Sequence, residues 1–336
     1  MKKHILITDP IHPTVLNGLQ KQFVVDQKIG LSKEQLLRIV GNYDALIGRT
    51  TTKLDVEVLR AGKNLTCIGV HATGWNHIDI EEATRLGITV LGFPSDNKQF
   101  KKDRLRGSFI GVAEHVLLSM LACAGDFYNT VAGMKAGKWE KYKFSGTELY
   151  GKTLGIVGLG RIGSLVAERA RAFGMRVVAY HPRLSKQEAK RRGAELVSLK
   201  TLYRVSDFIT VHVPQTVKTV GLINKKSFSE MKKGVVFINT ARAAVVVEKD
   251  LIEALENGVV RMASIDVFEH SPKGVNQRLV RMKNVLATPH IAGISQEGLE
   301  RVSSYIGKSV SDYLISGKKR GSITSPKKAR RAVQNV

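Results

Sequence analysis

Cysteine is scarce in this chain of 336 residues, which has only Cys67 and Cys123. Two thiols cannot form a disulfide framework or a four-thiolate metal site, so we expect a reducing, cytoplasmic compartment and no metal. Long apolar runs are also missing. No uninterrupted apolar stretch approaches the roughly 20 residues that a membrane-spanning helix requires. The sequence therefore predicts no integral membrane segment.

Acidic residues are few relative to basic ones. The chain has 53 Lys and Arg against 29 Asp and Glu, which gives a formal net charge of +24. The electrostatic field of such a positive charge attracts both acidic substrates and polyanions. The excess is either a general adaptation of the surface to its surroundings or a sign of binding to nucleic acid or another anionic surface.

Two polar segments carry much of this charge. Residues 95–108 contain five basic and two acidic side chains, and residues 318–331 contain seven basic side chains and no acid. We expect the first segment to be an exposed loop or insertion. The tail 318–336 lacks the apolar residues that would offset the cost of ordering, so it is predicted to be disordered. Both segments predict weak, non-specific polyanion binding.

Short β-rich runs alternate with polar helical segments along most of the chain. Up to about residue 95 the runs are HILIT, FVVDQ, ALIGR, CIGV and ITVLGF, and from residue 151 they are TLGIVG, RVVAY, FITVHV, VVFINT, ASIDVF and NVLATP. This alternation predicts an α/β fold with two Rossmann-like, doubly wound parallel-sheet domains.

The expected domain organisation is discontinuous. A first domain comprises residues 1–120, and residues 121–290 form a dinucleotide-binding domain. The amphipathic segment 291–317 is predicted to be a helix that returns to the first domain, followed by the basic tail 318–336. The long apolar pattern of GVAEHVLLSMLACAG suits a helix that bridges the two domains.

A glycine-rich turn follows the strand TLGIVG and precedes an expected helix. Its residues are Gly158, Gly160, Arg161, Ile162 and Gly163. The first glycine allows the tight turn, the second lets the backbone approach a pyrophosphate, and the third permits close packing of helix on strand. The N–H groups of the helix N-terminus then hold the anion. The strand-turn-helix-strand context predicts a dinucleotide site.

The end of the next strand bears on the choice of cofactor. An acid that bonds the ribose hydroxyls is usual there in NAD sites, but VVAY is followed by His181, Arg183 and Lys186. Cations would accept a 2′-phosphate, so NADP is favoured over NAD. The alternative is that these are ordinary members of a basic surface, which leaves NAD open.

Several ordered motifs between about residues 40 and 315 resemble the D-isomer-specific 2-hydroxyacid dehydrogenase family. They are HATGWNHIDIEEATRLGITV, GVAEHVLLSML, GKW, ELYGKTLGIVGLGRIG, SDFITVHVPQTVKTVGLIN, INTARAAVVVEKDLIEAL, DVFEHSP and ATPHIAG. The resemblance implies an NAD(P)-dependent oxidoreductase that acts on a small 2-keto or 2-hydroxy acid, of the glyoxylate, hydroxypyruvate, phosphoglycerate or D-lactate class. It also implies a homodimer paired through the cofactor domain, with a cleft between the two domains.

The same resemblance implies roles for individual residues. Arg242 would orient the substrate carboxylate and carbonyl, and His290 would exchange the proton on the carbonyl oxygen. The loop Ala72, Thr73 and Gly74 would hold the substrate carboxylate through backbone N–H groups. The cofactor would be lined by Pro214, Thr219, Thr240 and, on the nicotinamide side, Asp266. Turn and cap chemistry is the competing explanation for these last four residues.

One departure from the family pattern lies close to the catalytic set. The family acid falls five residues after the aspartate of DVF, and this chain has Ser271 there. That carboxylate would normally orient His290. Glu269 lies two residues earlier and is the candidate substitute. The alternative function, a dinucleotide-binding, corepressor-like interaction protein with vestigial catalysis, rests on this departure and on the basic tail.

Overall fold

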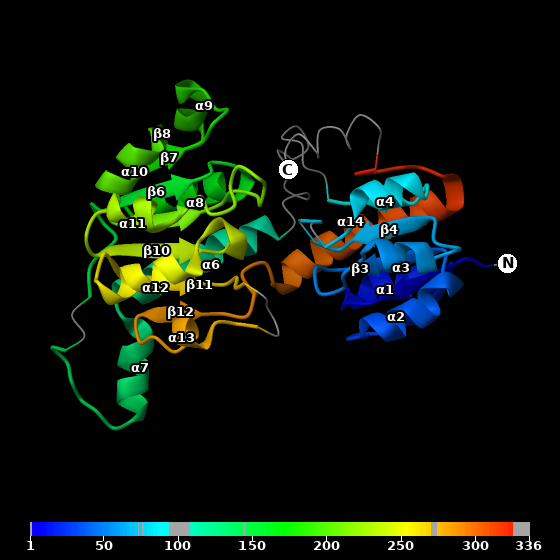
Figure 1. The fold of residues 1–336 in the computed structure, drawn as a ribbon, viewed down its shortest axis with the longest axis horizontal. Helices are drawn as coiled ribbons and strands as arrows, with labels where there is room; N and C mark the ends of the chain where they lie inside the picture. The colour runs from blue at the N-terminus through cyan, green and yellow to red at the C-terminus, as the bar shows by residue number, and fades with distance from the viewer. Residues whose placement is uncertain are drawn as a thin grey trace. The chain divides into compact units, whose positions relative to one another are not determined.

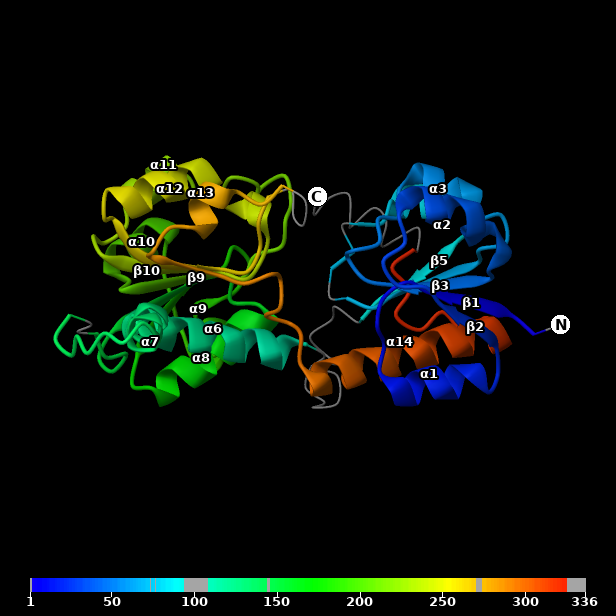
Figure 2. The same cartoon turned by 90° about the horizontal axis from the view of Figure 1, so that it is seen from below.

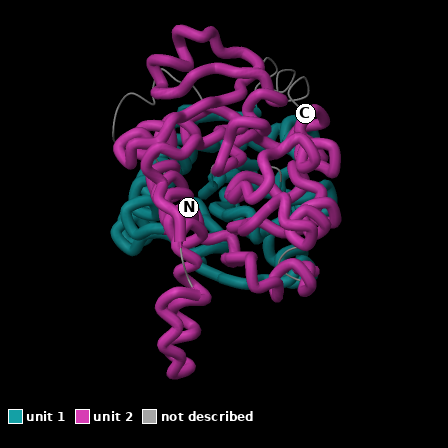
Figure 3. Tube along the Cα trace, turned by 90° about the vertical axis from the view of Figure 1, so that its left-hand side faces the viewer, with its two compact units in different colours: residues 1–108, 295–335 teal, residues 109–294, 336 magenta. Residues whose placement is uncertain are grey.

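The computed structural model describes residues 2–72, 74–75, 77–93, 108–143, 146–269 and 274–324. The chain divides into two compact units, coloured separately in Figure 3. Unit 1 comprises residues 1–108 and 295–335, and unit 2 comprises residues 109–294. Each unit contains one parallel sheet covered by helices, so the predicted fold class is confirmed, including the return of the chain to the first unit.

Unit 1 contains a five-stranded sheet in the order β2-β1-β3-β4-β5 (Figure 1). The strands are β1 (His4–Ile7), β2 (Val24–Gln27), β3 (Ala45–Gly48), β4 (Cys67–Val70) and β5 (Thr89–Leu91). The order reverses between β1 and β3, which is the doubly wound arrangement of the flavodoxin type. Strands β3 and β4 are buried along their full length, which explains their continuous apolar sequences ALIG and CIGV.

Helices cover both faces of this sheet (Figure 2). One face carries α2 (Lys33–Ile39), which continues into η1 (Val40–Asn42), α3 (Val56–Ala61) and α4 (Ile80–Arg85), and the other carries α1 (Pro13–Gln20) and α14 (Gln296–Ser316). Helix α14 is the predicted returning helix. It crosses β4 at Gly69, where an added Cβ would lie 2.7 Å from Val310 and 2.8 Å from Ile306. A glycine is therefore required for this close approach.

The start of the tail does not show the disorder that we predicted. Ser322 pairs with Leu91 in an antiparallel bridge, and the N–H of Ile323 donates to the Val90 carbonyl at 2.8 Å. The Ile323 side chain is buried in the core of unit 1, beside Gly92. One apolar side chain and an open sheet edge thus order residues 318–324. The predictions for the rest of the tail and for residues 95–107 lie outside the described residues.

Unit 2 contains a seven-stranded parallel sheet in the order β12-β11-β10-β9-β6-β7-β8. The strands are β6 (Thr153–Val157), β7 (Arg176–Tyr180), β8 (Glu195–Leu196), β9 (Phe208–Val211), β10 (Val235–Asn239), β11 (Val260–Ile265) and β12 (Val285–Ala287). This is the dinucleotide-binding strand order with one strand, β12, added at the edge. The order reverses between β6 and β9, so ligands are expected beyond the carboxyl ends of these strands.

The helices of unit 2 also form two layers (Figure 2). One layer contains α6 (Phe109–Ala124) and α8 (Arg161–Ala172), and the opposite layer contains α10 (Leu199–Val205), α11 (Lys225–Ser229) and α12 (Glu248–Glu256). The remaining helices are α7 (Phe127–Lys135), α9 (Lys186–Arg191), η3 (Ala243–Val245) and α13 (Gln277–Val280). No single helix in the described ranges is long and apolar enough to cross a membrane, and only α6 and α7, bent by 64°, reach that length and composition as a pair.

The boundary between the units lies earlier than we expected. We predicted the first domain to end at residue 120, which cuts through α6, whereas the whole of α6 belongs to unit 2. The helix packs on α8, β10 and β11, and the Ser264 hydroxyl of β11 donates to Ser119 of α6 at 2.9 Å. Its apolar pattern is therefore that of a core helix of the second unit.

Candidate functional site

The glycine-rich turn connects β6 to α8 at the point where the strand order reverses. Gly158 has a φ of 104°, and an added Cβ there would lie 2.8 Å from the His212 carbonyl carbon. A Cβ on Gly163 would overlap the Gly158 carbonyl oxygen. In contrast, a Cβ on Gly160 would meet nothing within 4 Å, so the turn is open where α8 begins. The guanidinium of Arg161 lies 4.3 Å from the centre of the Phe109 ring.

The basic side chains that follow β7 include one, Arg192, that the sequence did not single out. His181 accepts a hydrogen bond at Nδ1 from the Arg183 backbone N–H at 3.2 Å. Arg192 donates from Nη1 to the Leu159 carbonyl of the glycine-rich turn at 2.8 Å and pairs through Nη2 with Glu188 at 3.2 Å. Burial lowers the pKa of His181, and the charges of Arg192 and Arg183 lower it further against the opposing effect of Glu188.

The predicted cofactor-lining residues divide into two kinds. Thr219 closes a turn, because its hydroxyl donates to the Pro214 carbonyl at 2.6 Å and accepts from the Thr216 N–H at 2.8 Å. Thr240 lies at the carboxyl end of β10, and its buried hydroxyl has no hydrogen-bond partner among the described residues. A bound ligand is one way in which a buried hydroxyl of this kind is satisfied. Together with the open space over Gly160, the hydroxyl fits a bound dinucleotide.

Arg242 follows β10 at the same edge of the sheet. Its side chain is partly buried, and burial lowers the pKa of its guanidinium. Nη1 donates to the Ala241 carbonyl at 2.7 Å, and Asn239 Nδ2 donates to the Arg242 carbonyl at 3.2 Å. Among the described residues no carboxylate pairs with this guanidinium. The remaining N–H donors of Arg242 can therefore hold an anionic ligand.

His290 is presented by a loop that Asp266 holds. Asp266 is 1% exposed and accepts hydrogen bonds from the Thr288 hydroxyl at 2.6 Å, the Ile291 N–H at 2.8 Å and the Ala292 N–H at 2.9 Å. These donors lie on both sides of His290, whose φ of 59° is in the left-handed region. Since that conformation is unfavourable for histidine, the three bonds fix the backbone that carries the imidazole.

These bonds give Asp266 a structural task that the sequence did not suggest. Its predicted contact with the nicotinamide stays a prediction. A further residue of α6, His115, lies against the same network, with Nε2 at 3.4 Å from the Thr288 hydroxyl. Burial lowers the pKa of His115, against the opposing charge of Asp266.

The carboxylate partner of His290 stays a prediction as well. Ser271 lies in the stretch 270–273, outside the described residues. Glu269 immediately precedes that stretch, is exposed, and donates its backbone N–H to Glu248 at 2.8 Å. Groups of three potential metal ligands do not occur in the described parts of the chain.

In unit 1 the predicted carboxylate-binding loop follows β4. Ala72 is packed against the core and Gly74 is partly buried, whereas Thr73 is outside the described residues. The role of this loop as a source of backbone N–H donors for the substrate carboxylate stays a prediction.

A second polar cluster at this edge of the unit 1 sheet was missed. Buried Asp9 accepts from the Arg49 N–H at 2.8 Å and the Thr52 hydroxyl at 3.2 Å. His71 Nε2 lies 2.8 Å from the Ser303 hydroxyl. Burial lowers the pKa of Arg49, with the charge of Asp9 opposing. The signal in the sequence was the polar run GRTTT directly after a buried strand.

Comparisons with known proteins place these observations in a family. A family model described as the NAD binding domain of D-isomer specific 2-hydroxyacid dehydrogenase matches residues 117–292. The chain is 41% identical to a D-3-phosphoglycerate dehydrogenase of Archaeoglobus fulgidus over 307 residues, which cover 91% of this chain and 56% of that protein. It is 40% identical to a hydroxypyruvate reductase of Thermotoga maritima over 274 residues, covering 81% and 85%.

A solved structure agrees with the sequence matches. The D-lactate dehydrogenase from Aquifex aeolicus, complexed with NAD and lactic acid, is similar with a TM-score of 0.80 at 27% identity, covering 96% of this chain and 99% of that one. The chain spans about half the length of the phosphoglycerate dehydrogenases that it matches, since the match covers 56% of the Archaeoglobus protein. It covers most of the hydroxypyruvate reductase.

Proposed function

The chain belongs to the D-isomer-specific 2-hydroxyacid dehydrogenase family, and from this premise we propose that it transfers hydride between a nicotinamide cofactor and a small 2-keto or 2-hydroxy acid. The substrate class includes glyoxylate, hydroxypyruvate, pyruvate and 3-phosphohydroxypyruvate. When bound, the nicotinamide supplies the hydride to the carbonyl carbon or accepts it from the alcohol carbon.

The observation that carries this proposal is the state of Arg242. A partly buried guanidinium without a carboxylate partner in the described residues is costly unless an anion neutralises it. A substrate carboxylate supplies that charge and accepts two parallel hydrogen bonds. A remaining N–H donor can polarise the carbonyl oxygen, which favours attack at the adjacent carbon.

His290 then handles the proton. In the reductive direction its protonated imidazole donates to the carbonyl oxygen, and in the oxidative direction its neutral form accepts the hydroxyl proton. The task of Asp266 is to hold the loop so that the imidazole stays at one position while its charge changes. Glu269 remains our candidate for the carboxylate that orients the ring.

A panel of 2-keto acids tests the proposal. The purified chain is mixed with each acid and with NADH or NADPH, and the loss of nicotinamide absorbance is followed. We expect turnover with at least one member of the panel. The corresponding aldehydes without a carboxylate should be poor substrates, because they leave Arg242 unneutralised. Equal rates with acids and aldehydes would contradict the role of Arg242.

NADP is the cofactor that we propose to be preferred. His181 and Arg183 occupy the end of β7, where an acid would repel a 2′-phosphate. Arg192 adds a second guanidinium to that of Arg183, and its bond to the Leu159 carbonyl holds it at the glycine-rich turn. The nearby acid, Glu188, is paired with Arg192, so its charge is offset.

A homodimer is the proposed assembly. Large apolar side chains are exposed on α6 and α7 and in the segment that follows, namely Leu118, Leu121, Phe127, Tyr128, Met134 and Trp139. Exposed apolar side chains on consecutive elements of the chain are typical of a contact between protein copies. Two buried free thiols, Cys67 and Cys123, fit a reducing compartment, for which we propose the cytoplasm.

The two remaining sequence hypotheses differ in support. Polyanion binding through residues 95–108 and the tail stays a prediction, because most of both segments lies outside the described residues. The alternative of an interaction protein with vestigial catalysis gains nothing from the family match or from the state of Arg242.

A further inference from the structure

One part of unit 2 holds a disproportionate share of the positive charge. Residues 161–204 contain eleven Lys and Arg and three Glu, and this stretch of the chain therefore supplies a third of the formal net charge of +24. The residues form α8, β7, α9, β8 and all but the last residue of α10, with β8 at the edge of the sheet.

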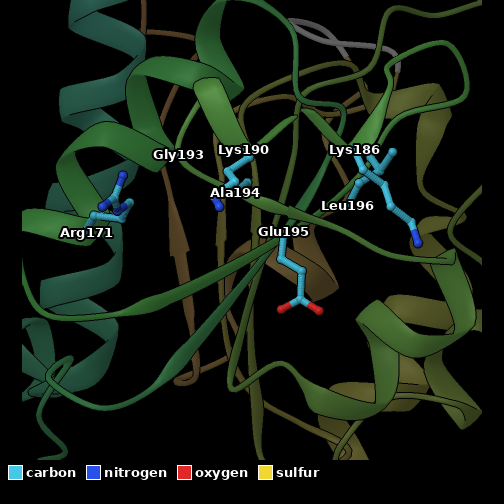
Figure 4. A pocket seen from close by; sticks show the side chains of 7 residues that line it. All are labelled: Arg171, Lys186, Lys190, Gly193, Ala194, Glu195 and Leu196. Carbon is cyan, nitrogen blue, oxygen red and sulfur yellow. The ribbon is translucent and has the colours of Figure 1, made fainter. Parts of the chain in front are cut away.

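A hollow of about 580 Å³ lies along this edge. Figure 4 shows the side chains that line it, with Arg171, Lys190 and Lys186 spread across the lining; the others are Gly193, Ala194, Glu195 and Leu196. Arg171 is in the last turn of α8, and its Cδ lies 3.3 Å from the position of a Cβ added to Gly193. A glycine at 193 thus leaves room for the arginine stem beside the hollow.

The acids of this stretch do not neutralise the hollow. Glu195 pairs with Arg176 at 2.8 Å, and Glu188 pairs with Arg192 at 3.2 Å. Within the described residues no ion pair is formed by Arg171, Lys186 or Lys190. Three cations that form no ion pair, against the single carboxylate of Glu195 in the lining, raise the concentration of anions at this surface.

Two exposed aromatic rings lie at the carboxyl end of α8. Phe173 follows Arg171 by two residues and is 43% exposed, and Tyr150 is 76% exposed. The Tyr150 ring lies against Gly174, where an added Cβ would be 2.8 Å from Cε2. The rings therefore lie at the end of α8 that carries Arg171. We call this set, Tyr150, Arg171, Phe173, Lys186 and Lys190, the edge surface.

We propose that the edge surface binds single-stranded nucleic acid. Lys and Arg side chains release counter-ions from phosphates, and exposed aromatic faces stack on unpaired bases. Exposed aromatic rings have no partner on a polyanion without bases. They also have none on a duplex, whose bases are stacked inside, so a single strand is the ligand that uses both the cations and the rings. The proposal goes beyond the dehydrogenase function and does not depend on it.

Fluorescence anisotropy of a labelled oligouridylate, titrated with the full chain at several salt concentrations, tests the proposal. The double variant Arg171→Glu/Lys190→Glu should lower the slope of log affinity against log salt by about 1 to 2, since each phosphate contact contributes about 0.7. The matched control is Lys21→Glu/Lys63→Glu, which makes the same change of charge on exposed lysines of unit 1. This control should keep the slope of the native chain.

The aromatic part is tested separately. Tyr150→Ala should weaken oligouridylate binding about tenfold without changing the salt slope, whereas Tyr150→Phe should retain the affinity. Thermal unfolding of each variant checks that the fold is kept.

Four results would overturn the proposal. They are an equal loss in the Lys21/Lys63 control, unchanged affinity in Tyr150→Ala, displacement of the oligonucleotide by NADPH, and loss of binding on removal of residues 325–336 alone. The third result would assign the cations to the cofactor, and the last would assign the binding to the tail.

Discussion

Replacement of Asp266 by Asn separates two roles for this residue, support of the His290 loop and contact with the nicotinamide. The buried carboxylate accepts from the Thr288 hydroxyl and the Ile291 N–H at Oδ1, and from the Ala292 N–H at Oδ2. An asparagine side chain keeps one acceptor oxygen and places an NH2 group against a backbone N–H. At least one bond is then lost and one buried N–H is left unpaired.

The magnitude follows from these bonds. A hydrogen bond to a charged group contributes about 1.5 to 3 kcal/mol, and an unpaired buried donor costs a similar amount, so unfolding should become easier by about 3 kcal/mol. The left-handed backbone of His290 costs about 1 to 2 kcal/mol and relaxes when its support is removed. A displacement of about 1 Å at a catalytic group lowers the rate about 100-fold. We therefore expect kcat to fall about 100-fold, with little change in cofactor affinity.

Urea unfolding and steady-state kinetics on the best 2-keto acid measure the two effects. Ser264→Ala is the matched control, because it removes a buried hydrogen bond to Ser119 two positions before Asp266 in the chain. This variant should lose about 1 kcal/mol of stability and keep its kcat. If Asp266→Asn instead weakens cofactor binding while kcat stays within about twofold, the residue contacts the nicotinamide and our account of the loop is wrong.

Three further predictions concern pH, cofactor choice and assembly. Burial, with the charge of Arg49, lowers the pKa of His71 to about 4, whereas the unfolded chain takes up this proton near 6.5. The free energy of unfolding should therefore fall by about 3 kcal/mol as the pH is lowered from 6.5 to 4. In urea titrations His71→Gln should flatten that dependence. NADPH should bind more tightly than NADH. Arg192→Ala should reduce this preference about tenfold, whereas Arg191→Ala, at an exposed arginine, should leave it unchanged. Equal effects of the two variants in cofactor titrations would refute a specific role of Arg192 in NADPH binding. Leu118→Glu/Leu121→Glu should convert a dimer into a monomer in light scattering, and a native chain that is already monomeric would contradict the proposed contact.

Features that depend on neighbouring residues in the sequence were predictable. The turn at Gly158 and Gly163 could be read locally, because Gly158 has a φ of 104° in the turn itself and Gly163 packs against the Gly158 carbonyl of the same strand-turn-helix unit. The parallel sheets followed from the alternation of strand and helix patterns, which extends over the whole chain. The two-unit organisation followed from the restart of that alternation after residue 151.

Features that depend on distant residues were not. Arg192 donates to the Leu159 carbonyl, which lies 33 positions earlier in the chain. Nothing in the segment KRRG at 190–193 distinguishes that arginine from its neighbours. Asp266 binds donors 22 to 26 positions away, so its support of the His290 loop could not be read from DVF. Ile323 was assigned to a disordered tail because only its pairing beside Val90, more than 200 positions earlier, orders it.

The most direct test of the central claim is the rate of nicotinamide oxidation by a 2-keto acid in the native chain, Arg242→Gln and His290→Asn. The native chain should turn over at least one acid of the panel. Arg242→Gln should raise KM and lower kcat together, because the carboxylate and the carbonyl lose the same cation. His290→Asn should abolish turnover while cofactor binding, followed by nicotinamide fluorescence, persists. Turnover that survives both substitutions, or a native chain that reduces no 2-keto acid with either cofactor, would contradict the account.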